Sequence, residues 1–227
     1  MRRALFGWLA IALIAGFARL PADDASEEED AIRAATRWKG KARIDEKLPA
    51  AARVAVKFES LNDAALAALA KQPRIGSIQA FDGTRCTVKG LTTLQALPNL
   101  QRLVLNKSGV TDKGLAAIAG CKELRELTIP VSTITDGGLA ALTKLMRLEA
   151  LDLSDDAKIT DKGMAQIQLL VRLEKLHLSN TAITDKALLE LKPLEGLLSL
   201  SVMGTKVTAS AAERFIEEMP NLRVVRR

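Results

Sequence analysis

Residues 148–164, LEALDLSDDAKITDKGM, hold the pattern that decides the fold. They open with a Leu-x-x-Leu-x-Leu motif over residues 148–153, whose apolar residues alternate with polar ones at the end, and this predicts a short strand with one buried face. Thr160 and Asp161 follow, just before a helical apolar spacing. Because such residues accept hydrogen bonds from the free N–H groups of a first helical turn, they predict a helix start.

The same pattern recurs along the chain at intervals of 24 or 25 residues. The repeats begin near residues 51, 75, 100, 124, 148, 173 and 197, and residues 222–227 form a truncated closing strand. The helix-start motif of residues 159–164 also recurs, at 110–115, 134–139 and 183–188. A constant period of this length is typical of a solenoid, in which no repeat buries its apolar surface alone and stacked neighbours build the core.

The composition agrees with thin stacked layers. Apolar residues make up 48% of the 227 residues, but aromatic residues only 3%, and there is no Tyr. The core must therefore consist of Leu, Ile, Val and Ala. We predict an α/β right-handed solenoid of about seven repeats, with parallel strands on its concave face and short helices on its convex face.

In these motifs the chain resembles the leucine-rich-repeat proteins. The Leu-x-x-Leu-x-Leu core followed by Ile-Thr-Asp-x-Gly-Leu is similar to the ribonuclease-inhibitor-like class, and within it to the subtype of F-box adaptors and of exported bacterial proteins, planctomycete ones especially. The resemblance covers residues 51–227. The chain departs from the family pattern in the strand-to-helix turn. The usual Asn is replaced there by Ser108, Ser132, Thr181 and Thr205. The resemblance implies a protein that binds partners.

The N-terminal residues predict export. Met1-Arg2-Arg3 supplies a positive start, residues 4–18 are uncharged, and Arg19 closes the run. Fifteen residues are fewer than the roughly 20 that span a bilayer as a helix, so we predict a cleaved signal peptide over residues 1–22. Alternatively, this segment is an uncleaved membrane anchor, and in that case it is the only part of the chain expected to contact a membrane. A third interpretation is a buried helix of the folded domain.

Residues 23–50 are expected to form an acidic linker and an N-terminal cap, made of a helix and a strand. The cap is needed because the first layer of a solenoid otherwise exposes apolar side chains and an unpaired strand edge. Residues 51–227 then form the solenoid. The chain thus divides into a signal peptide, a cap and a repeat array.

Charge and cysteine content exclude several classes of function. The formal net charge is +6, and without residues 1–22 the chain keeps 30 basic and 27 acidic residues, an excess too small to predict a nucleic-acid partner. Cys86 and Cys121 fall in different columns of buried aliphatic residues, which argues against a disulfide. Two distant cysteines and one histidine supply no metal-ligand cluster, and no cofactor motif is present.

Candidate binding residues lie on the outward side of the strands. The residue between the last two apolar positions of successive strands gives one column: Ala55, Gln79, Val104, Thr128, Asp152, His177 and Ser201. Polar side chains concentrate at its C-terminal end, and we expect five residues to contact a protein partner or a wall polymer: Asp152, Asp155, Lys175, His177 and Ser201. Phe58 and Phe81 lie near the other end of this face, where the N-terminal helix is expected to cover them.

Two other functions remain open from the sequence. Asp152, His177 and Ser201 could form a weak hydrolytic triad, but a flat strand offers no oxyanion hole and no Gly-x-Ser-x-Gly motif is present. The protein could also be a structural scaffold of the envelope or a self-assembling spacer. The pattern favours a non-catalytic binding module of the cell envelope over both.

Overall fold

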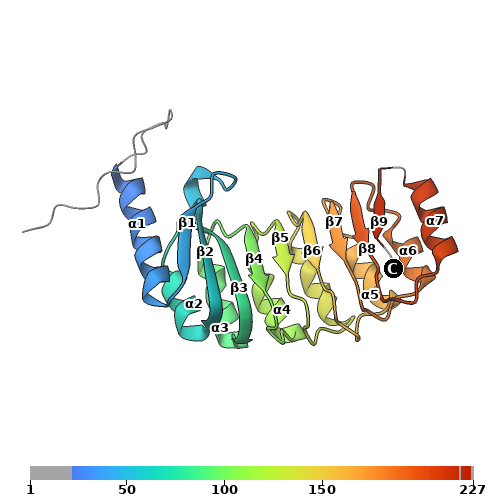
Figure 1. Ribbon diagram of the computed structural model, residues 1–227, viewed down its shortest axis with the longest axis horizontal. Coiled ribbons are helices and arrows are strands. Elements are labelled where there is room, and N and C mark those ends of the chain that lie inside the picture. The colour runs from blue at the N-terminus through green and yellow to red at the C-terminus, as the bar shows by residue number, and fades with distance from the viewer. Residues whose placement is uncertain (1–21, 220, 226–227) are drawn as a thin grey trace, which may run out of the picture.

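The computed structural model describes residues 22–219 and 221–225, so the predicted signal peptide lies almost entirely outside the described residues. The protein forms one elongated, curved array (Figure 1). Its nine strands are β1 (Lys41–Ile44), β2 (Val54–Asn62), β3 (Ile75–Arg85), β4 (Arg102–Leu105), β5 (Glu126–Thr128), β6 (Ala150–Asp152), β7 (Lys175–His177), β8 (Ser199–Ser201) and β9 (Arg223–Val225).

Helices alternate with these strands. The α-helices are α1 (Ala22–Arg37), α2 (Asp63–Leu69), α3 (Val88–Thr93), α4 (Asp112–Ile118), α5 (Asp161–Ile167), α6 (Asp185–Leu191) and α7 (Ala209–Glu218). Three short 3₁₀ helices complete the set: η1 (Ala50–Ala52), η2 (Leu94–Ala96) and η3 (Gly138–Lys144). From β2 to α7, each repeat therefore supplies one strand followed by a helical segment, which after β3 consists of α3 and η2 together.

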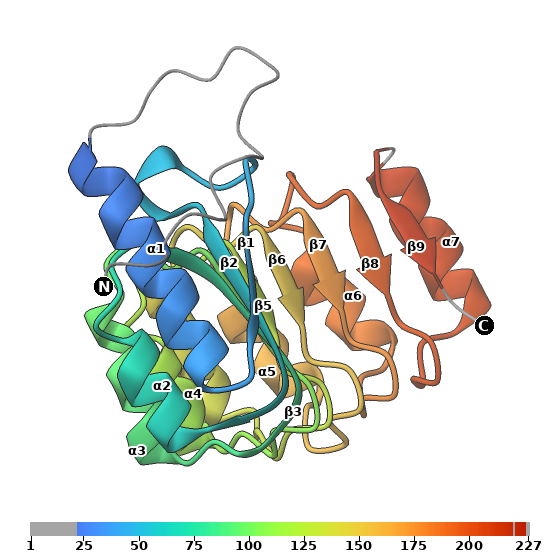
Figure 2. The same cartoon turned by 60° about the vertical axis from the view of Figure 1, so that its left-hand side comes forward.

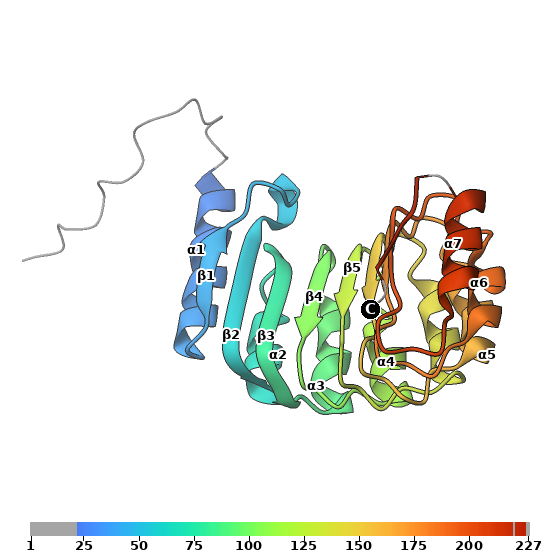
Figure 3. The same cartoon turned by 45° about the vertical axis from the view of Figure 1, so that its right-hand side comes forward.

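The strands form a single open sheet in chain order from β1 to β9. All neighbours from β2 to β9 are parallel, whereas β1 runs antiparallel to β2. Figure 3 shows the strands on one side of the array and the helices of the repeats on the other. This confirms the predicted leucine-rich-repeat solenoid.

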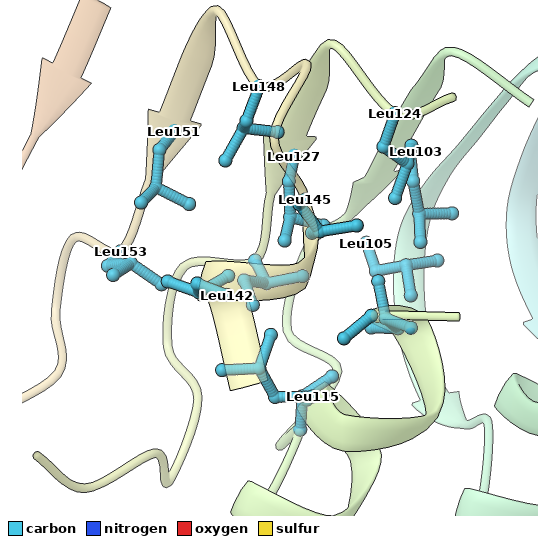
Figure 4. Close-up of a cluster of buried hydrophobic side chains, with 14 of the residues drawn as sticks. Leu103, Leu105, Leu115, Leu124, Leu127, Leu142, Leu145, Leu148, Leu151 and Leu153 are labelled. Carbon is cyan, nitrogen blue, oxygen red and sulfur yellow. The ribbon is translucent and has the colours of Figure 1, made fainter. Parts of the chain in front are cut away.

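The core is a continuous seam of aliphatic side chains between the sheet and the helices (Figure 4). In the repeat that begins at residue 148, Leu148, Leu151 and Leu153 are at most 1% exposed. Helix residues such as Leu115 and Leu142 meet the strand leucines from the opposite side and are fully buried. Since each layer is closed only by its neighbours, the fold is stabilised by stacking.

The threonines and the Asn that precede the helices act largely as predicted. Five side-chain oxygens accept a hydrogen bond from a first-turn N–H group, those of Asn62, Thr111, Thr160, Thr184 and Thr208. Two repeats differ. Thr87 precedes α3 without a side-chain cap bond, and the segment after Thr135 is the 3₁₀ helix η3, which also has no side-chain cap. Two glycines at its start, Gly137 and Gly138, disfavour a regular α-helical turn.

Five of the helix starts have an Asp directly after the capping position, and this Asp has a role that the sequence analysis did not identify. Its carboxylate accepts both the N–H and the hydroxyl of the Thr one turn further along the solenoid, at 2.5–2.9 Å. These Asp–Thr clamps join Asp63 to Thr87, Asp112 to Thr135, Asp136 to Thr160, Asp161 to Thr184 and Asp185 to Thr208. The helix-start motif therefore ties adjacent repeats together as well as capping helices.

Strand β1 forms the N-terminal edge of the sheet, and helix α1 packs at the same end of the array (Figure 2). The acidic stretch expected to be a linker is helical, because α1 already begins at Ala22. Glu28 is 7% exposed and accepts two hydrogen bonds from Arg53, at 2.6 and 3.3 Å. Ala31 and Ala35 of the same helix are fully buried against the first layer. Ion pairs and small apolar residues thus hold α1 in place.

Two expectations about the first strands are wrong. Lys57, rather than Ala55, lies beside Gln79, because the pairing of β2 with β3 shifts between Val54 and Ala55. Phe58 belongs to the core at 1% exposure, whereas Phe81 is 48% exposed and lies 4.4 Å from the Lys57 Nζ atom, measured to the ring centroid. The N-terminal cap therefore does not cover Phe81.

Both cysteines are buried and unpaired, as their repeat positions indicated. Burial raises the pKa of each thiol to about 12. Among the described residues, no helix is long and apolar enough to cross a membrane.

Candidate functional site

The predicted row of outward-facing residues exists on β5 to β8. Thr128 pairs with Asp152, Asp152 with His177, and His177 with Ser201. Neighbouring strands in a sheet lie about 4.8 Å apart, so these side chains stand at a fixed pitch. Because the strand motif recurs in every repeat and the strands pair motif to motif, a column read from the sequence becomes a row on the concave face.

The side chains of this row differ in their exposure and in their hydrogen-bond partners. His177 is exposed, and its imidazole has no hydrogen-bond partner among the described residues. Asp152 is half-buried, and its Oδ1 atom accepts the backbone N–H of Ser154 at 2.9 Å. Ser201 is only 9% exposed, and its hydroxyl lies 2.8 Å from that of Ser179. His177 is the most accessible side chain of the row.

These contacts do not assemble a hydrolytic relay. In a Ser-His-Asp triad the imidazole bonds to both other members. Here Ser201 is bonded to Ser179, and Asp152 to the backbone at Ser154, while His177 bonds to neither Asp152 nor Ser201. The geometry of the row fits a polar contact surface better than a nucleophile.

Asp155 lies at the rim of the concave face, just beyond the end of β6. It adopts a left-handed backbone conformation with φ 65°, and its carboxylate accepts a hydrogen bond from the Asn180 side chain at 2.7 Å. A positive φ recurs at the same place in five consecutive repeats, at Lys107, Val131, Asp155, Asn180 and Gly204. These residues share one tight turn, which presents Asp155 to solvent.

Asp156, next to it, is buried at 2% exposure. Burial raises the pKa of its carboxyl to about 6, an effect that a hydrogen bond from the Ser132 hydroxyl opposes only in part. The nearby carboxylates of Asp155 and Asp152 raise the pKa further. The concave rim therefore contains an acid that titrates close to neutral pH.

Lys175 belongs to a second surface feature, a shallow polar hollow of about 250 Å³. The loop that follows β1 forms one wall, and the first residues of β4 to β7 form the other. Its lining comprises Asp45, Lys47, Leu48, Gln101, Arg102, Arg125, Glu126, Glu149, Ala150, Glu174 and Lys175. Apart from Leu48 and Ala150, every one of these side chains is polar or charged.

Ion pairs between adjacent strands order this hollow. The Arg102 Nε atom donates to Glu126 at 2.6 Å, and Arg102 also lies 4.0 Å from Asp45. Arg125 pairs with Glu149 in the same manner. Lys175 is exposed and has no ion pair among the described residues.

Of the five predicted contact residues, the structure thus places Asp152, His177 and Ser201 in one row, Lys175 in the hollow, and Asp155 at the rim. The paired residues of the hollow were not predicted. A signal for them exists in the sequence: opposite charges recur 24 residues apart, as in Arg102 and Glu126, and one repeat brings such residues side by side. Within the described ranges, no group of three or more His, Cys, Asp or Glu side chains is arranged to hold a metal ion.

Comparisons with known proteins agree with the architecture. A family profile described as "Leucine Rich repeat" matches residues 96–119. No curated protein has a significantly similar sequence. Among solved structures, an internalin (inlF) from Listeria monocytogenes superposes with a TM-score of 0.58 at 20% identity, covering 74% of this chain and 46% of its own. This chain therefore spans less than half of that internalin.

A second internalin, internalin C2 from Listeria monocytogenes, is similar over 89% of this chain and 83% of its own, with 20% identity and a TM-score of 0.50. At this level of identity the likeness concerns the fold. The parallel sheet and the recurring leucine core give the chain a leucine-rich-repeat fold, and one of its repeats matches the family profile directly.

Proposed function

We propose that the protein is a non-catalytic binding module of the cell envelope, which recognises a protein partner through the concave face of β4 to β8. Solenoids commonly use such extended concave surfaces for binding. The observation that carries the proposal is the paired row of Asp152, His177 and Ser201 beside the hollow that contains Lys175. Export is supported by the charge and hydropathy pattern of residues 1–22 and by the exported subtype that the repeats resemble.

The size of the surface favours a macromolecule over a small ligand. Four strand spacings separate β4 from β8, which is about 19 Å at 4.8 Å per step. The hollow is open and polar, whereas small-molecule sites are mostly enclosed and apolar. A polypeptide segment laid across the strands would reach both the row and the hollow.

The surface is also preorganised. The strands fix the backbone, and the Arg102–Glu126 and Arg125–Glu149 pairs restrain long side chains before any partner binds. Binding then loses less side-chain entropy, because fewer groups have to be ordered. Lys175 and His177 are exposed side chains on the same strand, so they offer a partner a cation and a hydrogen-bonding group side by side.

The test is a pull-down from an extract of the native cell envelope. The baits are the native protein, an Asp152→Ala/His177→Ala double variant, a Lys175→Glu variant and a Lys162→Ala control on the convex helix α5. We expect the native protein and the control to capture the same partner, and both concave variants to lose at least about tenfold in affinity, as is typical of central interface residues. Capture of that partner by the double variant with unchanged affinity would remove the concave face from the proposal.

A further inference from the structure

Three exposed aliphatic side chains cluster at the edge of the solenoid where helices return to strands. Met146 is 56% exposed, Leu169 50% and Val171 62%. Met146 and Val171 occupy the same position in successive repeats, four residues before the paired residues Ala150 and Lys175, so they lie on neighbouring turns. Leu169 precedes Val171 by two residues on the same turn. We call these three residues the edge patch.

The turns around the edge patch are basic. Residues 119–123, 143–147, 168–172 and 192–196 form four successive helix-to-strand turns that contain two acidic residues, Glu123 and Glu195, and five basic ones, Lys122, Lys144, Arg147, Arg172 and Lys192. Arg147 pairs with Glu123, and Lys192 pairs with Glu218 at 2.6 Å.

Three basic side chains of these turns are free to contact another molecule. Lys122, Lys144 and Arg172 are exposed, and none of them has an ion pair within the part of the chain that the structure describes. Lys144 and Arg172 lie on the same two turns as the edge patch, and Lys122 lies on the turn before them. The edge therefore combines aliphatic side chains with an excess of positive charge, and it is complementary to a surface that is apolar and anionic.

The chain also enters the fold at this edge. Arg74, in the first helix-to-strand turn, pairs with Asp24 and with Glu27, the latter at 2.7 Å, so the first turn of α1 lies here. Figure 2 shows α1 beginning at the edge where the strands begin. The sequence before α1 contains the uncharged residues 4–18 with arginines at both ends. In the uncleaved chain this most apolar segment directly precedes α1, whose first turn lies at the edge.

We propose that this edge lies against an anionic lipid surface, with the edge patch in the interfacial region and Lys122, Lys144 and Arg172 against the headgroups. Lipid binding of this kind depends on exposed apolar side chains together with basic residues, each of which contributes near a negatively charged bilayer. A second copy of the chain fits the edge less well, because apposed copies would bring the same cations together. This contact goes beyond the sequence expectation, which confined membrane contact to the N-terminal segment.

The orientation leaves the row of Asp152, His177 and Ser201 accessible. The edge patch lies in the turns, whereas His177 projects from the face of the sheet, so a lipid surface against the turns does not cover it. The two surfaces are also tested by different variants. The lipid proposal therefore stands or fails separately from the proposed function.

Fluorescence of a single labelled position tests the proposal in the full chain. Cys86 and Cys121 are buried and their thiols have a raised pKa, so a thiol-reactive, environment-sensitive dye reacts preferentially with an introduced cysteine. The test protein carries Val171→Cys in the edge patch. The matched control carries Leu189→Cys on helix α6, where the native side chain is 61% exposed compared with 62% for Val171.

Both labelled proteins are mixed with vesicles of phosphatidylglycerol and phosphatidylcholine, and with vesicles of phosphatidylcholine alone. We expect a blue shift and protection from an aqueous quencher on the anionic vesicles for the Val171→Cys protein, and neither effect for the Leu189→Cys control. Adding Lys144→Glu and Arg172→Glu to the Val171→Cys protein should abolish the shift. If the N-terminal segment holds the protein on the vesicles while the dye at position 171 stays exposed to the quencher, the proposal is wrong. An equal shift on both vesicle types would contradict the role assigned to the cations.

Discussion

The two carboxylate oxygens of Asp112 divide between the two donors of Thr135 on the next turn of the solenoid. Oδ1 accepts the backbone N–H and Oδ2 accepts the hydroxyl, each at 2.8 Å. A Cβ atom on Gly138 would overlap this carboxylate, so the glycine of the next helix start leaves room for it. One short motif thus caps its own helix and fixes the spacing to the following repeat.

Removing a clamp should weaken the junction between two repeats. We expect Asp112→Ala to lower the free energy of unfolding by about 2 kcal/mol, because two hydrogen bonds to a charged acceptor are lost and the donors of Thr135 are left without it. Asp112→Asn, which keeps one acceptor oxygen, should lose less. Urea unfolding followed by circular dichroism measures both. A loss for Asp112→Ala no greater than that for the neighbouring Lys113→Ala would contradict the clamp.

One junction lacks the clamp and offers the opposite experiment. Val88 stands where other repeats have Asp, so Thr111 receives no carboxylate from the preceding turn, and Gly114 leaves space beside it. We expect Val88→Asp to raise the free energy of unfolding by about 1 kcal/mol, since Val88 is 41% exposed and gives up little burial. Thermal unfolding should show a higher midpoint for Val88→Asp than for a Val88→Ala control. An unchanged midpoint would mean that the missing bonds cost nothing at this junction.

Val131 is the β-branched member of the column of left-handed residues, with φ 57° and 51% exposure. Its side chain is crowded by the backbone in this conformation, which Asn adopts more readily, as Asn180 does at the equivalent position. We expect Val131→Asn to stabilise the protein by about 1 kcal/mol. Val131→Thr keeps the branched Cβ and serves as the control. Equal urea midpoints for the two variants would show that no strain is relieved.

The parts of the structure that follow from one repeat could be predicted from the sequence. Leu151 and Leu176 occupy the same repeat position, and equal spacing makes them neighbours in adjacent strands. The same argument correctly placed Asp152 beside His177. Periodicity is informative here because each strand meets only its two neighbours.

Features that depend on side-chain reach or on local irregularity could not be predicted in this way. The pattern around Asp112 is explained equally well by a helix cap, so its bond to Thr135 was not apparent. The shift at Ala55 comes from an irregular pairing of β2 with β3 that leaves no mark on the repeat spacing. Phe58 is covered next to Gly40, as expected, but Phe81 stays 48% exposed, because the repeat pattern does not determine how far the N-terminal segment reaches.

Asp156 should make stability depend on pH in a direction opposite to that of most carboxylates. Burial raises its pKa from 3.8 to about 6 in the folded state, so the folded protein binds this proton more tightly than the unfolded chain does. Its contribution to stability is fully present below about pH 4 and is lost as the pH rises through about 6. Between these limits the free energy of unfolding should fall by about 3 kcal/mol on account of this group.

Comparison of the native chain with Asp156→Asn isolates this effect from other carboxylates. The variant side chain can still accept the bond from the Ser132 hydroxyl but cannot ionise, so we expect it to be more stable than the native chain at pH 8 and to show little advantage at pH 4. Asp155→Asn is the control: it removes only a nearby charge and should move the transition to slightly lower pH. Urea unfolding at intervals from pH 4 to 8 gives the difference directly. A constant difference between Asp156→Asn and the native chain over this range would show that Asp156 is ionised throughout, and that Ser132 and the surrounding solvent offset its burial.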